Sequence, residues 1–111
     1  EANIHHTLHS AEATLEDGAS KATAAVPYNK DDYNTYGLIW EAEKMDFFVY
    51  VILTYTYHKQ EGATSTQWPF DLPFYLILNQ AGGAGWPGAI DDKDLPFEMQ
   101  VDYVRVYQWK K

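Results

Sequence analysis

Hydrophobic and polar residues alternate along several short segments of the chain. The alternation is clearest in Tyr33–Glu41, Ile52–Tyr57 and Phe97–Trp109. Because successive side chains of a strand point to opposite faces, a period of two residues predicts β-strands. No window of about ten residues combines helical caps with a helical period. The pattern therefore predicts an all-β chain.

Six or seven short strands separated by turns are expected. They cover Asn3–Ser10, Ala22–Val26, Tyr33–Glu41, Met45–Val49, Ile52–Tyr57, Phe74–Gln80 and Phe97–Trp109. Asp17-Gly18 and the charged stretch Glu41–Lys44 are turn signals between them. Such a series is typical of a meander in an antiparallel β-sandwich. No internal repeat or linker interrupts residues 1–111, which are expected to form a single domain.

Composition and charge narrow the range of partners. The net charge is −8, from sixteen acidic and eight basic residues, which argues against nucleic acid, anionic membrane surfaces and strongly anionic glycans. No apolar run approaches the roughly 20 residues that span a bilayer. The absence of cysteine excludes disulfides and thiolate metal sites. Nine tyrosines, five phenylalanines and four tryptophans suit both a sandwich core and a sugar-stacking surface.

Three motifs follow one another in the C-terminal part of the chain: WPFDLPFYLILN, GGAGWPG and MQVDYVRVYQ. Together they resemble the C-terminal half of glycoside hydrolase family 16, the laminarinase and β-glucanase family. The segments NIHHTLHS, YGLIW and FFVYVILTYTY are similar to the preceding strands of that family, in family order. The resemblance implies a concanavalin-like jelly roll, here a partial one, whose concave face holds a β-glucan or galactan. It also implies a secreted, periplasmic or cell-surface protein.

The catalytic strand of the family is missing from these residues. The resemblance implies a retaining mechanism with a Glu-x-Asp-x-x-Glu strand, in which the first glutamate is the nucleophile and the last is the acid/base. Retention needs two carboxyls about 5 Å apart. Glu41-Ala-Glu43 lacks the aspartate, and Glu98 and Asp102 would lie roughly 13 Å apart on a strand. If Glu1 were the last catalytic glutamate, too few residues would remain before His9 for a turn and a strand.

Two functions follow from this pattern. The first is part of a retaining endo-acting glycoside hydrolase for a β-linked polysaccharide or oligosaccharide, inactive alone. The second is a noncatalytic carbohydrate-binding or interaction module. Half a jelly roll leaves sheet edges and an apolar face uncovered, which predicts a homo-oligomer or a complementing N-terminal half. Ile39 and Tyr50-Val51, apolar where the family is polar, favour such a partner. No nucleic-acid or membrane partner is expected.

The first strand carries candidate ligand-binding residues. His5, Thr7 and His9 share one strand face. The resemblance places this face beside the catalytic strand and matches His9 to a family histidine. An imidazole can hydrogen-bond a carboxylate or a sugar hydroxyl; the alternative is a solvated strand face. His6 points the same way as Leu8 and is expected to be a packed core histidine.

Further candidates lie in the C-terminal motifs. The resemblance matches Asn79 to an asparagine that reaches the substrate, with a strand-end cap as the alternative. Trp86 in the glycine-rich corner and Trp68 before Pro69 are either sugar-stacking platforms or core residues. Asp102 matches an aspartate that binds a structural calcium in some members, with a solvated carboxylate as the alternative. No other cofactor is expected.

Overall fold

A computed structural model describes residues 3–83, 85 and 87–110 of the chain. It divides into two compact units, Glu1–Phe74 and Tyr75–Lys111, and each unit is described by itself. None of the described residues forms a helix long and apolar enough to cross a membrane. The expected single domain over the whole chain stays a prediction.

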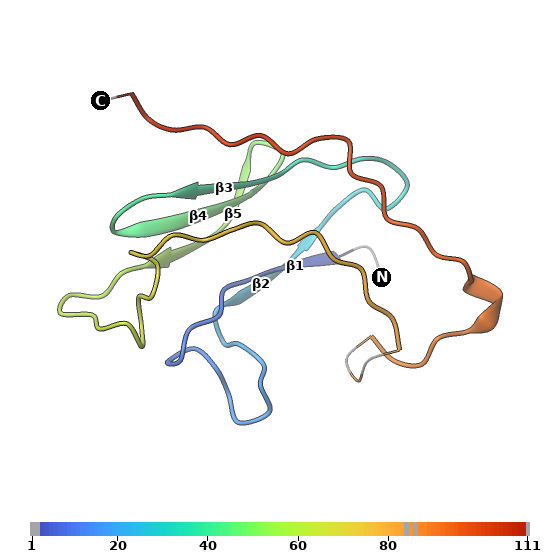
Figure 1. Ribbon diagram of the computed structural model, residues 1–111, viewed down its shortest axis with the longest axis horizontal. Helices are drawn as coiled ribbons and strands as arrows, with labels where there is room; N and C mark the ends of the chain where they lie inside the picture. Colours follow the sequence, from blue (N-terminus) through green and yellow to red (C-terminus); the bar gives the residue numbers. More distant parts are fainter. Residues whose placement is uncertain (1–2, 84, 86, 111) are drawn as a thin grey trace. The chain divides into compact units, whose positions relative to one another are not determined.

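The first unit contains two antiparallel sheets (Figure 1). Strands β1 (Asn3–Thr7) and β2 (Thr23–Pro27) form one sheet, and β3 (Tyr36–Trp40), β4 (Lys44–Val49) and β5 (Ile52–His58) form the other in that order. Each of the five lies within a few residues of a predicted strand. The prediction of an all-β antiparallel architecture, consistent with a partial sandwich, is confirmed.

The loop between β1 and β2 turns at Asp17-Gly18, as predicted. Gly18 has a φ of 84°, a conformation that glycine adopts without steric cost. The Ala19 amide donates to Asp17 Oδ1 at 3.0 Å, which closes an Asx turn. The long connection then feeds β2 back against β1 in register, with His5 opposite Ala25.

A β-bulge shapes the pairing of β4 with β5. Phe47 pairs with Tyr55 and Phe48 pairs with Leu53, so Thr54 is an extra residue on β5. Bulges redirect side chains. The Thr54 hydroxyl donates to the carbonyl of Phe47 at 2.9 Å and meets the His6 ring at 2.6 Å from its Nδ1. This contact joins β1 to the three-stranded sheet.

The turn between β4 and β5 consists of Tyr50 and Val51. Tyr50 has a φ of 53° and is the one described non-glycine residue with positive φ. The left-handed conformation of the turn thus falls on Tyr50 and not on the β-branched Val51, which would adopt it with more strain. The Tyr50 hydroxyl lies 3.0 Å from both the carbonyl oxygen of Tyr33 and Asn34 Oδ1, and these two acceptors share its one proton. These bonds anchor the turn to a neighbouring loop.

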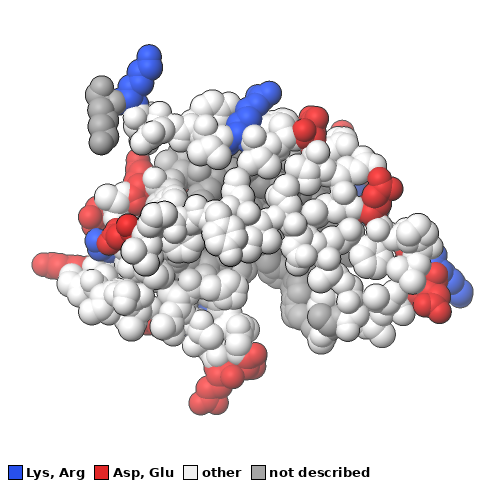
Figure 2. Space-filling model, in the orientation of Figure 1, with Lys and Arg blue, Asp and Glu red and all other residues white. Residues whose placement is uncertain are grey.

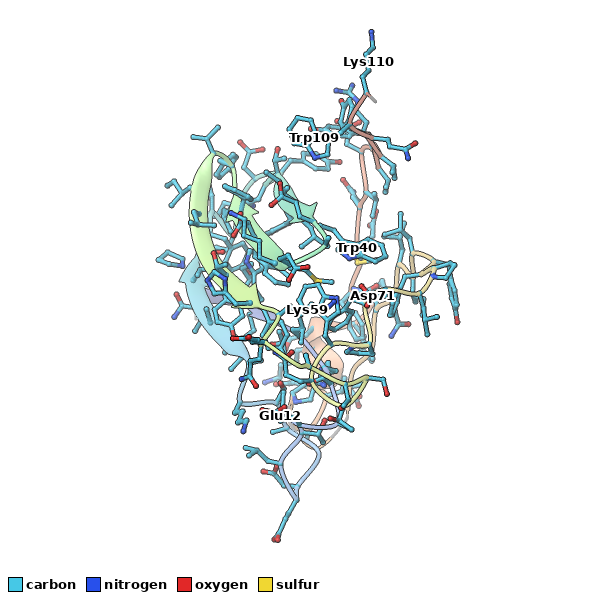
Figure 3. All side chains as sticks on the ribbon, turned by 90° about the vertical axis from the view of Figure 1, so that its left-hand side faces the viewer. Glu12, Trp40, Lys59, Asp71, Trp109 and Lys110 are labelled. Carbon is cyan, nitrogen blue, oxygen red and sulfur yellow. The ribbon has the colours of Figure 1, made fainter. Side chains whose placement is uncertain are left out.

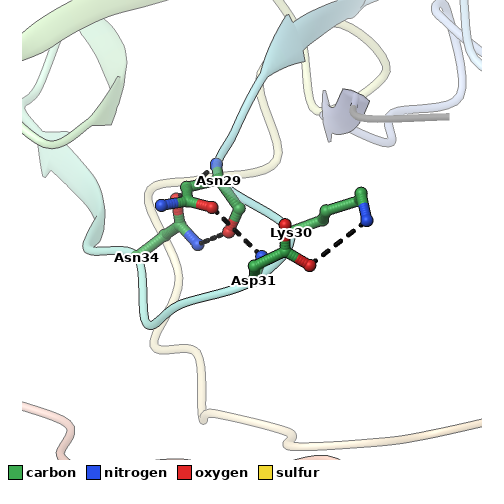
Figure 4. Close-up of polar contacts among 4 residues, drawn as sticks. All are labelled: Asn29, Lys30, Asp31 and Asn34. Carbon is green, nitrogen blue, oxygen red and sulfur yellow. Dashed lines mark hydrogen bonds and ion pairs between the residues drawn. The ribbon is translucent and has the colours of Figure 1, made fainter.

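That loop is rigidified by its own amide side chains (Figure 4). The Asn34 side chain donates to the carbonyl of Asn29 at 2.6 Å and accepts from the Asn29 amide at 2.9 Å. The Asp31 amide donates to Asn29 Oδ1 at 3.1 Å, and Lys30 pairs with the Asp31 carboxylate at 3.2 Å. The acceptor of the Tyr50 hydroxyl is therefore held in place.

Substitution of Tyr50 separates backbone strain from these hydrogen bonds. Y50G and Y50A both remove the side chain, but only glycine adopts positive φ without strain. Y50G should therefore be more stable than Y50A by about 1 kcal/mol. Y50F keeps the ring and should lose about 1 kcal/mol with the hydroxyl. Urea unfolding midpoints of the three variants measure both effects. Equal stability of Y50G and Y50A would contradict the strained turn.

The core of the first unit lies between its two sheets. The buried hydrophobic cluster consists of Leu8, Ala13, Ala22, Met45 and Trp68, with Phe47, Tyr55, Tyr57, Ala63 and Phe70 packed against it. His6 contributes from β1, its ring 5.5 Å from that of Phe47. The cluster is small, and no described large side chain is completely buried. Each member therefore carries a considerable share of the stability.

The second unit corrects two predictions. The segments expected as strands at Phe74–Gln80 and Phe97–Trp109 are not strands among the described residues. Alternation requires only an extended backbone, whereas a strand needs a hydrogen-bonded neighbour. The described part of the second unit contains one short helix, the 3-10 turn Asp92–Asp94.

A compact corner is visible within the second unit. A Cβ on Gly82 would lie 2.8 Å from the Phe97 ring and 3.1 Å from Ile90 Cδ1. The Gly82 backbone therefore approaches both side chains more closely than any other residue type would allow. Many apolar side chains of this unit remain exposed, including Leu76 and Leu78.

Candidate functional site

The outward face of β1 and the segment just after it carry polar residues that the sequence singled out; β1 ends at Thr7, so His9 lies beyond the strand. His5 and His9 are exposed, and the Thr7 hydroxyl lies 2.7 Å from the Thr23 hydroxyl of β2. We call His5, Thr7, His9 and Thr23 the histidine face. Two imidazoles and two hydroxyls offer both donors and acceptors to a ligand rich in hydroxyl groups.

The inward face of β1 is different in character. His6 is buried, and its Nδ1 lies 2.6 Å from Thr54 Oγ1. Burial lowers the pKa of His6 from its ordinary 6.5, so the ring is neutral near pH 7. The prediction that His6 is a packed and hydrogen-bonded core residue is confirmed.

Trp68 is a core residue, the second of its two predicted alternatives. It is 3% exposed. Its ring stacks on Tyr57 with the planes 7° apart and the centroids 5.9 Å apart, and Phe70 meets it edge-on at 5.3 Å. The indole Nε1 donates to Asp71 Oδ1 at 3.1 Å. No ring face of Trp68 is left for a sugar to stack on.

Asp71 extends this contact to the surface of the first unit. Its other carboxylate oxygen pairs with Lys59 Nζ at 3.5 Å, and Figure 3 labels both residues. Asp71 is itself exposed, so the ion pair is screened by solvent. The role of Asp71 is to orient the indole of Trp68.

The remaining predicted residues lie in the second unit. Asn79 and Asp102 are both exposed. Trp86 lies outside the described residues, and its role as a platform stays a prediction. Within the described part of the chain, no group of three or more histidine, cysteine, aspartate or glutamate side chains is arranged to hold a metal ion. The structural calcium at Asp102 stays a prediction.

A polar cluster that the sequence did not single out surrounds Asp46 on β4. The Asp46 carboxylate accepts from the Thr56 hydroxyl at 2.6 Å and pairs with Lys44 Nζ at 3.1 Å. The Thr56 hydrogen bond, followed by that of Lys44, lowers the pKa of Asp46 below its ordinary 3.8. Its side chain is only 12% exposed. A carboxylate held this firmly in its charged form is suited to structure rather than to proton donation.

A sequence signal for this cluster did exist. Asp46 interrupts an otherwise apolar strand, KMDFFV, and a carboxylate there needs a partner on a neighbouring strand. The register places Asp46 directly opposite Thr56 on β5 and Ile39 on β3. Thr56 therefore supplies the donor that an apolar neighbour cannot supply.

Comparison with known proteins identifies the family of the chain. Over 108 residues, 97% of its length, the chain is 55% identical to a keratan-sulfate endo-1,4-beta-galactosidase of Sphingobacterium multivorum. It is 34% identical over 113 residues, 96% of its length, to a beta-glucanase of Rhodothermus marinus. It is 35% identical over 85 residues, 70% of its length, to a glucan endo-1,3-beta-glucosidase A1 of Niallia circulans. The chain belongs to glycoside hydrolase family 16.

This family 16 chain corresponds to a part of its relatives. It covers 26% of the Sphingobacterium protein, 40% of the Rhodothermus protein and 12% of the Niallia protein. No family model and no solved structure matches it. Two of these relatives are named as endo-acting β-glycosidases and the third as a beta-glucanase, so the chain is related to glycoside hydrolases.

The charge of the family 16 chain suits a neutral ligand better than an anionic one. Figure 2 shows uncharged residues over most of the visible face, with charged side chains standing out singly or in small groups. Acidic residues outnumber basic ones by sixteen to eight over the whole sequence. Long-range attraction of a polyanion is therefore weak.

Proposed function

We propose that this chain is part of a retaining, endo-acting glycoside hydrolase that cleaves a β-linked polysaccharide. The observation that carries the proposal is the 55% identity to the keratan-sulfate endo-1,4-beta-galactosidase over 97% of the chain. The identity to the beta-glucanase is 34%. This difference favours a galactose-containing, β-1,4-linked backbone over a β-glucan as the substrate.

The histidine face is the proposed contribution of the first unit to substrate binding. His5, His9 and Thr23 are exposed and Thr7 is half-buried, and His5 and Thr7 lie on the side of β1 that points away from the core. Such groups can hydrogen-bond neighbouring hydroxyls of a sugar ring, which orients the chain for attack. In the second unit, taken by itself, Asn79 is a separate candidate, because its exposed amide has both a donor and an acceptor.

The 111 residues alone are expected to be inactive. They contain no Glu-x-Asp-x-x-Glu sequence, and the paired carboxyls supply the chemical step itself. Glu41 lies 3.9 Å from Lys44 Nζ at a hairpin, and Glu98 accepts a hydrogen bond from Gln100 at 2.9 Å. Binding groups without the nucleophile and the acid cannot accelerate cleavage.

We further propose that the missing carboxylates come from a complementing segment, either in a longer chain or in a partner. Exposed apolar side chains support such a contact. On β5, Ile52 and Leu53 are 65% and 54% exposed. Apolar area of this kind favours association with another β-rich surface. A second copy of this chain is the alternative occupant.

Reducing-end release tests the proposal. The purified 111-residue chain is incubated with keratan sulfate, with desulfated keratan and with a β-1,3-glucan. It is then mixed with the part of the Sphingobacterium enzyme that lies outside the matched region. We expect no release by the chain alone and release of galactose-terminated oligosaccharides from the mixture. Because the chain is acidic, the desulfated substrate should be cleaved faster at low salt, and added salt should narrow the difference.

The controls separate the competing functions. Release by the 111-residue chain alone would overturn the statement that its chemistry lies elsewhere. Saturable binding of an oligosaccharide, with no release in any mixture, would support the noncatalytic module instead. H9A and H5A in the mixture should lower the rate, whereas E16A, an exposed change in the turn before β2, should not.

A further inference from the structure

A small polar cavity opens in the first unit beside the core. Its volume is about 200 Å³. It is lined by Glu12, Lys21, Tyr55, Tyr57 and Gln60, together with two buried alanines. Figure 3 labels Glu12. The lining residues come from the β1–β2 connection and from β5 and the loop after it, two regions that are far apart in the sequence.

The cavity lies on the other side of the β1–β2 hairpin from the histidine face. Its alanines, Ala13 and Ala22, belong to the core cluster, and Tyr55 and Tyr57 pack against that cluster. The histidine face points away from the core. A ligand in the cavity would therefore not compete with one on the histidine face.

The lining presents free hydrogen-bonding groups around aromatic rings. The Tyr57 hydroxyl donates to the carbonyl of Gln67 at 2.7 Å, and its oxygen can still accept. The Tyr55 hydroxyl has no hydrogen-bond partner among the described residues. Burial raises the pKa of Tyr55, so the hydroxyl keeps its proton and can donate. The Gln60 side chain adds an amide at the edge.

Charge and size narrow the class of ligand. Glu12 and Lys21 carry opposite charges, so the lining selects for neither sign of charge. The volume of about 200 Å³ is below the roughly 300–1,000 Å³ of pockets for drug-sized molecules. A single six-membered ring with its hydroxyls suits this space, and a chain of several rings does not.

A second cavity in the same unit provides a contrast. It measures about 320 Å³ and is lined by apolar residues that include Val26, Val49 and Leu53. That apolar lining suits a hydrophobic side chain of another polypeptide. The same side chain placed in the first cavity would leave its phenols and its amide without hydrogen-bond partners. The polar cavity therefore calls for a polyhydroxylated ligand.

We propose that the cavity lined by Tyr55, Tyr57 and Gln60 binds a single neutral pyranose unit. The tyrosine rings contact the apolar face of the sugar, and the phenol, amide and carboxylate groups bind its hydroxyls. This site is an accessory contact to the glycan, separate from the histidine face. The choice of sugar rests on the proposed function, whereas the recognition chemistry rests on the lining alone.

Titration of the ¹⁵N-labelled chain with methyl β-D-galactopyranoside tests the site. Saturable shifts are expected at the backbone amides of Lys21, Ala22 and Gln60, with a Kd on the order of 1 mM for so small a ligand. Y55F keeps the ring and should weaken binding about three- to tenfold, because it removes one hydrogen bond. Q60A should do the same. Glycerol, which has hydroxyls but no ring, should give no saturable shift.

The NMR titration has its own control variant and its own contradicting outcomes, separate from those of the hydrolysis assay. E16A, an exposed change outside both the cavity lining and the histidine face, should leave the Kd unchanged. Shifts confined to the histidine face, an unchanged Kd in Y55F, or no saturable shift would each overturn the accessory site. The hydrolysis assay on the mixed proteins reports separately on the proposed function, so either idea can fail while the other holds.

Discussion

Replacing Trp68 with alanine should cost about 3–5 kcal/mol of unfolding free energy. Trp68 is 3% exposed, with Tyr57 stacked on its face and Phe70 against its edge. Alanine would leave a cavity that these rings cannot fill without leaving their own contacts. Since small domains are stable by only about 5–15 kcal/mol, the loss is a large share of the total. Urea unfolding followed by circular dichroism measures it.

Two further variants keep this prediction testable if W68A does not fold. W68F preserves an aromatic ring but removes the hydrogen bond from Nε1 to Asp71, and should fall between wild type and W68A. W109A removes a tryptophan that is 75% exposed and should change stability by no more than about 0.5 kcal/mol. If W68A instead kept full stability and lost glycan binding, Trp68 would be a surface platform and its burial would be wrong.

The strands of the first unit could be predicted from alternation because each finds its partner nearby in the sequence. The β3–β4–β5 meander needs only two short turns, so local pattern and tertiary pairing agree. The segments Phe74–Gln80 and Phe97–Trp109 alternate just as clearly, yet they form no strand. A periodic pattern specifies an extended backbone but no hydrogen-bonded neighbour, and a strand requires both.

Some features of the candidate site could likewise be predicted from the sequence, and others could not. Which face of β1 His5 and His6 occupy followed from a period of two, and His6 is buried as predicted. The burial of Trp68 could not be predicted, because an indole suits a core and a sugar-binding surface equally well. It depends on Tyr57 from β5, and only the folded chain places that ring beside Trp68. Asp46 was overlooked because its partner Thr56 lies on another strand.

Protonation of His6 should weaken the link between β1 and the three-stranded sheet. Thr54 donates its proton to the carbonyl of Phe47, so its oxygen accepts from His6 Nδ1–H. This assigns the proton of the neutral ring to Nδ1 and leaves Nε2 bare. A second proton would place a charge beside the Phe47 ring, where water is largely excluded. The folded state therefore favours the neutral ring.

The direction of the pH effect follows from the lowered pKa. In the unfolded chain His6 titrates near its ordinary 6.5, and burial lowers this pKa in the folded state. Between the two values the unfolded state binds more protons, so stability falls as pH is lowered from 6.5. Asp46 affects stability in a separate pH range. Because the pKa of Asp46 is lowered in the folded state, its contribution to the free energy of unfolding is complete above its ordinary pKa of 3.8 and is lost as the pH falls below that value. A fall in stability just below pH 6.5 thus reports on His6.

The variant H6Q isolates this effect. Glutamine can still donate a hydrogen bond to Thr54 but does not titrate, so unfolding midpoints of H6Q in urea should be equal at pH 5 and pH 7.5, whereas wild type should be less stable at pH 5. H9Q makes the same change at an exposed histidine and should keep the wild-type pH dependence. If H6Q and wild type lost the same stability on acidification, the buried imidazole would not be the acid-sensitive contact between the two sheets.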